Sequence, residues 1–268
     1  MTTTVKDDDR AFLGHPKALG YLAFTEAWER FSYYGMQSLL VLYMTKQLLL
    51  TPHVERIAGF SAFESFIQSV YHPGLSTQAI SSAIFGLYTS LVYLTPILGG
   101  IIADRLLGKT KTIVLGALLM AAGHFLMAFD VSFLLALLCL VLGTGCFKGN
   151  IASQVGALYS EHDLRRADAF QVFYLGINAG VIAAPLIAGT LGEEVGWHWG
   201  FGVAGVGMLI SLAIYLSGRK LLPPDPPLRK STDAPRPKLQ PGEGRTVALL
   251  ILLLPVLAAS VLCNQQIF

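Results

Sequence analysis

The sequence has 268 residues, of which 53% are hydrophobic and only 13% are charged, and its formal net charge is +2. This near-neutral balance gives no reason to expect nucleic acid as a partner. The apolar residues occur in long runs, which argues against an ordinary soluble domain and indicates an all-α membrane protein.

Seven hydrophobic helices are predicted along the chain, each close to or longer than the ~20 residues that an α-helix needs to cross a bilayer. They cover residues 18–50, 77–103, 111–129, 132–159, 167–190, 197–218 and 246–268. The first connection, 51–76, contains SAFESFIQSV, in which Phe63, Phe66, Ile67 and Val70 share one helical face. We therefore expect a short helix there that lies on the outer membrane surface.

Positively charged residues are concentrated in the N-terminal tail and in alternate connections, as with Arg105, Lys109 and Lys111 between the second and third helices. Connections of this kind stay in the cytoplasm. We therefore expect a multi-pass protein of the cytoplasmic (inner) membrane, with its N-terminus in the cytoplasm.

The sixth connection, LPPDPPLRKSTDAPRPKLQPGEGR, is rich in proline and charge and predicts a flexible cytoplasmic linker. We assign residues 1–222 to an N-terminal bundle of six membrane helices, 223–245 to the linker and 246–268 to a seventh membrane helix. That helix reaches Phe268 without a polar flank, so we expect it to begin a second bundle that this sequence does not contain.

The first helix carries an unusual charged stretch, TEAWERFSYYG, from Thr25 to Gly35. Each ionised side chain at mid-membrane costs roughly 2.5–3.5 kcal/mol. The polar and aromatic side chains of this stretch fall on one helical face, and they are Glu26, Glu29, Arg30, Tyr33, Tyr34 and Gln37. A second intramembrane cation, Lys148 in the fourth helix, brings the sum of these inner charges to zero.

Two interpretations of these charges remain open. The first is a static network of buried ion pairs. The second is a proton-coupling site built from Glu26, Glu29, Arg30 and Lys148. In that case a substrate carboxylate draws the cation away from a glutamate, which then holds a proton, and departure of the substrate reverses the exchange.

Other polar residues inside predicted helices could line a substrate cavity. Gln171, Tyr174 and Asn178 share one face of the fifth helix, and Tyr93 lies in the second. The alternative is ordinary packing and hydrogen bonding between helices. Pro96, Pro185 and Pro255 lie inside predicted helices and should bend or loosen them.

The sequence shows no pattern typical of an enzyme, a cofactor site or a metal site. The segment GTGCFKG has its glycines and lysine in the wrong order for a phosphate-binding loop, so we expect close helix packing at Gly143, Gly145 and Gly149. His124 and His198 are isolated. The three cysteines lie in apolar segments and predict no disulfide framework.

The charged stretch has a specific resemblance. E-x-x-E-R-F-x-Y-Y-G, complete from Glu26 to Gly35, resembles the signature of the proton-dependent oligopeptide transporter family (POT or PTR), a branch of the major facilitator superfamily. Three further segments resemble other motifs of that family, in the right order: YLTPILGGIIADRLLGKTKTIV, GTGCFKGNIASQVGALY and FYLGINAG. The chain thus resembles the N-terminal half of a bacterial peptide transporter with the start of helix seven.

The resemblance implies two six-helix bundles that bind substrate between them and give alternating access to it. It implies proton-coupled symport of di- and tripeptides. The residues that match the peptide site are Arg30, Tyr33, Tyr34, Tyr93, Lys148 and Asn178. Those that match the proton-coupling positions are Glu26 and Glu29.

The chain departs from the family pattern at a gate position. Many members have an arginine where this chain has Gln37, and pair it with an acidic residue on helix seven. Here helix seven offers Gln265 with its neighbours Asn264 and Gln266. The gating roles of Gln37 and Gln265 therefore stay open, as do the roles of Gln171 and Tyr174.

Two alternatives to peptide symport remain. The same fold could carry another solute, such as nitrate, or the protein could bind peptides as a receptor without moving them. The sequence does not predict peptide preference, proton stoichiometry or oligomeric state.

Overall fold

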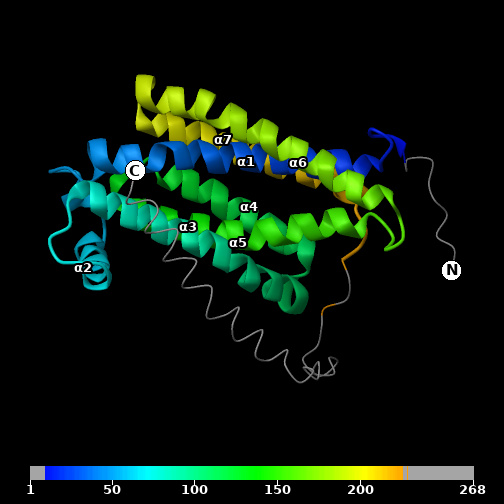
Figure 1. The fold of residues 1–268 in the computed structure, drawn as a ribbon, viewed down its shortest axis with the longest axis horizontal. Helices are drawn as coiled ribbons and strands as arrows, with labels where there is room; N and C mark the ends of the chain where they lie inside the picture. Colours follow the sequence, from blue (N-terminus) through cyan, green and yellow to red (C-terminus); the bar gives the residue numbers. More distant parts are fainter. Residues whose placement is uncertain (1–9, 226–227, 229–268) are drawn as a thin grey trace.

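The computed structural model describes residues 10–225 and Leu228, and within them the chain is almost entirely helical. Six long helices run side by side in an elongated bundle, with the short helix α2 at one end (Figure 1). The helices are α1 (Lys17–Tyr43), α2 (Phe60–Val70), α3 (Thr77–Ile102), α4 (Lys109–Leu126), α5 (Phe133–Ala157), α6 (Arg165–Ala184) and α7 (Trp197–Gly218). The only extended pairing in these residues is a bridge between Phe12 and His15. The predicted all-α class is confirmed.

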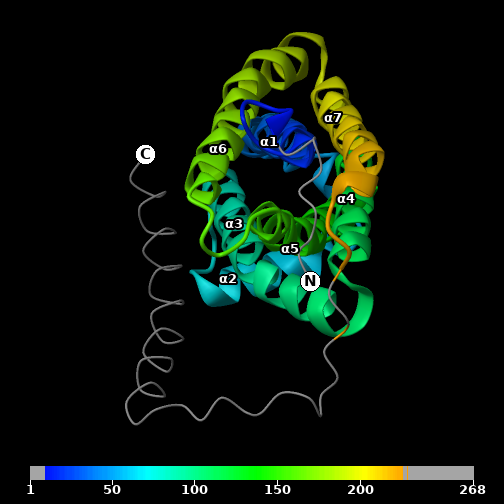
Figure 2. The ribbon, with the colours of Figure 1, turned by 90° about the vertical axis from the view of Figure 1, so that its right-hand side faces the viewer.

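Two helices organise the bundle. α1 packs against both α6 and α7, while α5 packs against both α3 and α4, and α4 also contacts α7. Viewed along the bundle, α6 and α7 flank α1 on one half, and α3 and α4 flank α5 on the other (Figure 2). The side of α1 that faces α5 therefore points into the interior.

Four helical stretches of the described chain are long and apolar enough to cross a membrane, judged by length and composition. They are Thr77–Leu107, Asp130–Ala157, Arg165–Val195 and Trp197–Leu221. α1 and α4 are not among them, although both pack against α7 in the same bundle. That α1 and α4 cross the bilayer stays a prediction.

The predicted helix bounds agree with the observed ones to within a few residues, with two exceptions. α1 ends at Tyr43 and continues as a wider π-helical turn to Leu48. α6 ends at Ala184, and π-helical turns carry the chain on to Val195. The change in α6 falls at Pro185, which has no backbone N–H for the helical ladder. The predicted loosening at this proline is confirmed.

Close helix crossings depend on glycine. Gly99 of α3 lies directly against the carbonyl of Gly145 on α5, where a Cβ atom would overlap the backbone. In the same way, Gly180 lets α6 approach the carbonyl of Ala27 on α1. These contacts bring backbones together without side chains between them, as in other membrane helix bundles.

The three glycines singled out in the sequence differ in their surroundings. Gly143 packs against Gly116 of α4, and Gly145 packs against Thr95 of α3, so their expected role is confirmed. The expectation is wrong for Gly149. A Cβ atom there would have its nearest neighbours on Pro96 at 3.8 Å, which is ordinary van der Waals distance.

The helix predicted in the first connection is present as α2, but only part of its apolar face is buried against the bundle. Ile67 is buried and Phe63 half-buried, whereas Phe66 and Val70 are exposed. The helix is turned so that one edge of its apolar face packs on the bundle. Its location on a membrane surface stays a prediction.

Polar contacts tie the connections together at each end of the bundle. At the end near α2, Asp130 accepts a hydrogen bond of 2.8 Å from the Tyr43 hydroxyl and lies 2.7 Å from Nδ1 of His53. At the other end, Asp225 accepts hydrogen bonds from the backbone N–H (2.9 Å) and the hydroxyl (3.0 Å) of Thr110. A carboxylate at this position satisfies the first turn of α4.

Asp225 belongs to the predicted linker, 223–245, of which the structure describes only the first residues and Leu228. The predicted seventh helix, 246–268, lies outside the described residues. So do Pro255 and the candidate gate residue Gln265.

Gly145→Ala is expected to destabilise the bundle by roughly 1–3 kcal/mol through overpacking. The added methyl group would lie 2.6 Å from the Cβ atom of Thr95 and 2.9 Å from its carbonyl carbon. The matched control is Gly149→Ala on the same helix, where the better helix propensity of alanine meets no close contact, so we expect unchanged or slightly higher stability. Thermal unfolding in detergent measures both, and equal melting temperatures would contradict this packing.

Candidate functional site

The charged face of α1 lies in the core of the bundle. The side chains of Glu26, Glu29 and Arg30 are only 4%, 0% and 4% exposed. Nε of Arg30 lies 3.1 Å from Oε1 of Glu26, one turn earlier, and also contacts Oε2 of the adjacent Glu29. One guanidinium is therefore shared by two carboxylates. When all three groups are ionised, this charged trio carries one surplus negative charge, which is costly in a dry interior.

The ion pairs leave hydrogen-bonding capacity unused. Oε2 of Glu26, Oε1 of Glu29 and Nη2 of Arg30 are buried and have no hydrogen-bond partner among residues 10–225. Buried polar atoms in proteins normally bond to protein groups or to ordered water. Within the described residues, the trio is therefore held together mainly by its ion pairs.

Aromatic rings surround the trio on α1 itself. The guanidinium carbon of Arg30 lies 5.4 Å from the centre of the Tyr33 ring, which is a cation–π distance. Tyr33 is buried and packs edge-on against Tyr34, with ring centres 5.1 Å apart. Tyr34 and Gln37 are half-buried. The predicted polar face thus runs from the sealed trio to partly accessible side chains one and two turns later.

Lys148, on α5, supplies the fourth charge. It is half-buried, and its Nζ atom lies 4.5 Å above the centre of the Tyr93 ring of α3. In the described part of the chain no carboxylate lies within ion-pair distance of Lys148. The charges of Glu26, Glu29 and Arg30 nevertheless act on it. Lys148 therefore balances the surplus charge of the trio through the electric field rather than by contact.

The remaining predicted binding residues are exposed on α3 and α6. Tyr93 is 65% exposed and Tyr174 is 56% exposed, and the side chains of Gln171 and Asn178 are exposed as well. The close approach of α6 to α1 at Gly180, beside the β-carbon of Arg30, places this part of α6 next to the charged stretch. The structure therefore gathers the buried charges in the core and the candidate binding groups on accessible surfaces beside it.

Tyr88 is a residue that the sequence argument missed. It lies on α3, is 3% exposed, and its ring stacks on that of Tyr33 with centres 6.5 Å apart and planes inclined by 23°. A tyrosine within an apolar helix that faces a charged helix is the sequence signal that could have identified it. Of the tyrosines on α3, the sequence argument singled out Tyr93 alone, as a possible cavity residue and as part of the family motif.

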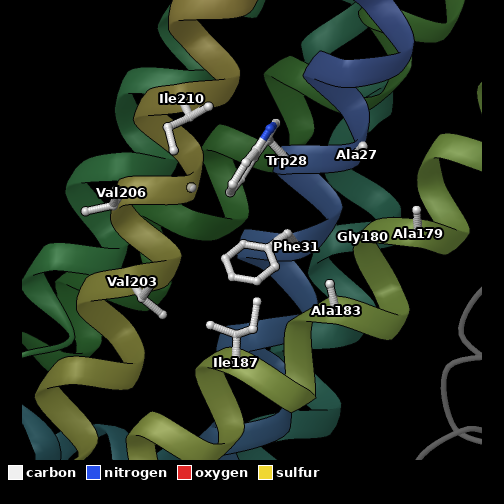
Figure 3. Close-up of a pocket in the computed structure, with 11 residues that line it drawn as sticks. Ala27, Trp28, Phe31, Ala179, Gly180, Ala183, Ile187, Val203, Val206 and Ile210 are labelled. Atoms are coloured by element: carbon white, nitrogen blue, oxygen red, sulfur yellow. The ribbon is translucent and has the colours of Figure 1, made fainter.

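An apolar groove lies on the opposite face of α1 from the charged trio. Its volume is about 340 Å³, and α1, α6 and α7 line it with the side chains of Trp28, Phe31, Ile187 and Val203 among others. Figure 3 shows Trp28 and Phe31 between the rims that α6 and α7 form. Because carbon atoms dominate its lining, this groove suits apolar chains and offers no group for a carboxylate or an amine.

The described residues contain no group of three or more His, Cys, Asp or Glu side chains that could hold a metal ion. Cys139 and Cys146 are free thiols. The charged trio itself offers ion pairs, sites for proton binding and a cation–π contact.

Comparison with known proteins places this helix bundle in a class of membrane transporters. The family model of the POT family matches residues 110–234. The di-/tripeptide transporter of Lactococcus lactis subsp. lactis is 42% identical, over 79% of this chain and 39% of that protein. The peptide transporter YePEPT of Yersinia enterocolitica is 35% identical, over 97% of this chain and 48% of that protein. A crystal structure of a mutant POT peptide transporter in complex with alafosfalin superposes with a TM-score of 0.66, at 36% identity over 95% of this chain and 48% of that one.

Over most of its length the chain is similar to peptide transporters of the POT family. It spans less than half the length of these relatives and corresponds to the N-terminal part of their fold. With its apolar helices, it is a multi-pass membrane protein. The relatives are transporters, and that the chain is not an enzyme stays a prediction.

Arg30→Gln is expected to destabilise the protein by about 3–5 kcal/mol, because it leaves two buried carboxylates without a cation. Adding Glu29→Gln to that variant removes one of the two charges and should restore much of the loss. The control Arg105→Gln removes an exposed cation and should change stability by no more than ~0.5 kcal/mol. Thermal unfolding in detergent measures all three, and a double variant no more stable than Arg30→Gln would count against the shared ion pair.

Proposed function

We propose that this chain forms the N-terminal bundle of a proton-coupled symporter for di- and tripeptides that works by alternating access. The observation that carries the proposal is the charged trio of Glu26, Glu29 and Arg30, buried in the core with one surplus negative charge that Lys148 balances without contact. A static network would be expected to pair its charges fully. In this network the second cation, Lys148, is only half-buried and makes no ion pair with a carboxylate of the described residues.

The arrangement of Lys148 supports a role in substrate capture. Its ammonium group rests on the exposed ring of Tyr93 and also interacts electrostatically with the buried trio. A peptide carboxylate that arrives from the side of Tyr93 meets Lys148 before Arg30. Tyr34 is half-buried and Asn178 is exposed, and both side chains can hydrogen-bond to a peptide backbone.

Proton coupling follows from charge balance. Once a substrate carboxylate occupies Lys148, the surplus negative charge of the trio loses its counter-charge in a medium of low dielectric constant. A proton on Glu26 or Glu29 restores neutrality. When the peptide leaves on the other side, Lys148 is free again and the proton is released. Each proton that moves inward contributes about 2.3 kcal/mol per 100 mV of membrane potential.

The peptide relatives support this choice of substrate over another anion. The di-/tripeptide transporter of L. lactis and the Yersinia peptide transporter share about 35–42% of their residues with the chain. The direct test uses the complete protein in liposomes with an inward proton gradient and a labelled dipeptide. Accumulation that an uncoupler abolishes is the expected result. Binding without accumulation would favour a receptor, and accumulation of nitrate instead would change the substrate.

Glu29→Gln is expected to abolish proton-driven accumulation while keeping exchange of peptide across the membrane. The amide keeps the size of the side chain but can neither take up nor release a proton. Counterflow of labelled dipeptide and uphill uptake are measured in the same liposomes. The control Glu55→Gln, at an exposed carboxylate in the connection before α2, should behave as the unmodified protein. Full uphill uptake by Glu29→Gln would remove Glu29 from the coupling step.

A further inference from the structure

Tyr88 presents a buried polar group that the mechanism above leaves unused. Its side chain is 3% exposed, and its hydroxyl has no hydrogen-bond partner in the described part of the chain. The buried Tyr43 and Tyr215 behave differently, because their hydroxyls donate to Asp130 and Gln154 over 2.8 and 3.0 Å. A buried hydroxyl without a partner is unfavourable and is rare in native proteins.

The polar surroundings of Tyr88 come from α1. Its ring stacks on Tyr33, which itself lies against the Arg30 guanidinium, and the charges of Glu29 and Arg30 act on the Tyr88 hydroxyl. On its other side, Tyr88 shares an apolar pocket with residues of α2, α3 and α5, namely Phe63, Ile84, Leu87, Leu91, Leu134, Leu137, Leu138 and Val141. The polar neighbours of the hydroxyl are therefore Tyr33, Glu29 and Arg30 of α1, and an apolar pocket adjoins the same side chain.

The unused hydrogen-bonding groups on the two helices are complementary. Tyr88 offers an O–H donor, and Glu29 offers the buried oxygen Oε1, which also has no partner among residues 10–225. Two such groups in one buried polar region are commonly joined by an ordered water molecule, which makes about three hydrogen bonds. The Nη2 group of Arg30, equally unpartnered, supplies a third partner for that water.

We propose that Tyr88 is a positioning residue of the proton site, and that its hydroxyl donates through a buried water to the Glu29 carboxylate. This inference rests on the proposed role of Glu29 in proton coupling. The donor stabilises the ionised carboxylate and remains in place when a substrate draws the counter-charge away. It thereby sets the pH at which Glu29 takes up and releases its proton, together with the other titratable and charged groups of the cluster, Glu26, Arg30, Tyr33 and Lys148.

The test compares the complete protein with its Tyr88→Phe variant, which keeps the ring and its stacking on Tyr33. Loss of the donor destabilises the ionised carboxylate, so the pH profile of proton-driven dipeptide uptake should move toward alkaline pH by about half to one unit. Exchange of peptide without a gradient should be unchanged. The control is Tyr43→Phe, which removes a buried hydroxyl bonded to Asp130 at the α2 end of the bundle. It should lower stability and leave the pH profile in place.

A second readout does not depend on transport. Infrared titration of the protein without peptide follows the band of protonated carboxyl groups, and the Glu29→Gln variant identifies the part that belongs to Glu29. Tyr88→Phe should displace the midpoint of that part in the same direction. If the protein does not accumulate dipeptide, the proposed function fails while this titration still decides the role of Tyr88. An unchanged midpoint in the titration overturns the proposal and leaves Tyr88 as a packing residue.

Discussion

The packing of this bundle has to accommodate one buried cluster of charges, in which two carboxylates share a single cation. A single guanidinium, that of Arg30, serves the carboxylates of both Glu26 and Glu29 in the buried core of the bundle. The arrangement is tolerable only if the surrounding helices hold it closely and if a further cation or proton balances its surplus charge. The close approach of α6 at Gly180 and the placement of Lys148 on α5 meet these two requirements.

The two faces of α1 differ in polarity. Its inner face carries the charges and Tyr33, and its outer face forms the floor of an apolar groove through Trp28 and Phe31. The charges are thus separated from hydrocarbon by the width of a helix. The candidate binding residues Tyr93 and Tyr174 are exposed, outside the buried core that holds the trio.

Much of this fold could be predicted from the sequence, because hydrophobic runs and single prolines act locally. The six described long helices, the polar face of α1 and the packing of Gly143 and Gly145 follow from such patterns. The contacts that particular side chains make between helices cannot be predicted from these local patterns. The periodicity of α1 could not reveal that Arg30 binds both glutamates while Lys148 rests on Tyr93, nor that Tyr88 stacks on Tyr33. The packing of α2 was predicted in part only, since the sequence does not show which edge of its apolar face the bundle covers.

The central claim is that the site stays electrically neutral by exchanging a proton for the counter-charge that a substrate carboxylate removes. Proton uptake by the complete protein on addition of a dipeptide, followed with a pH indicator in weakly buffered detergent solution, tests it most directly. The account predicts net uptake of protons near neutral pH, and loss of that uptake when Glu26 and Glu29 are both replaced by glutamine. Saturable dipeptide binding with no change in bound protons would contradict it.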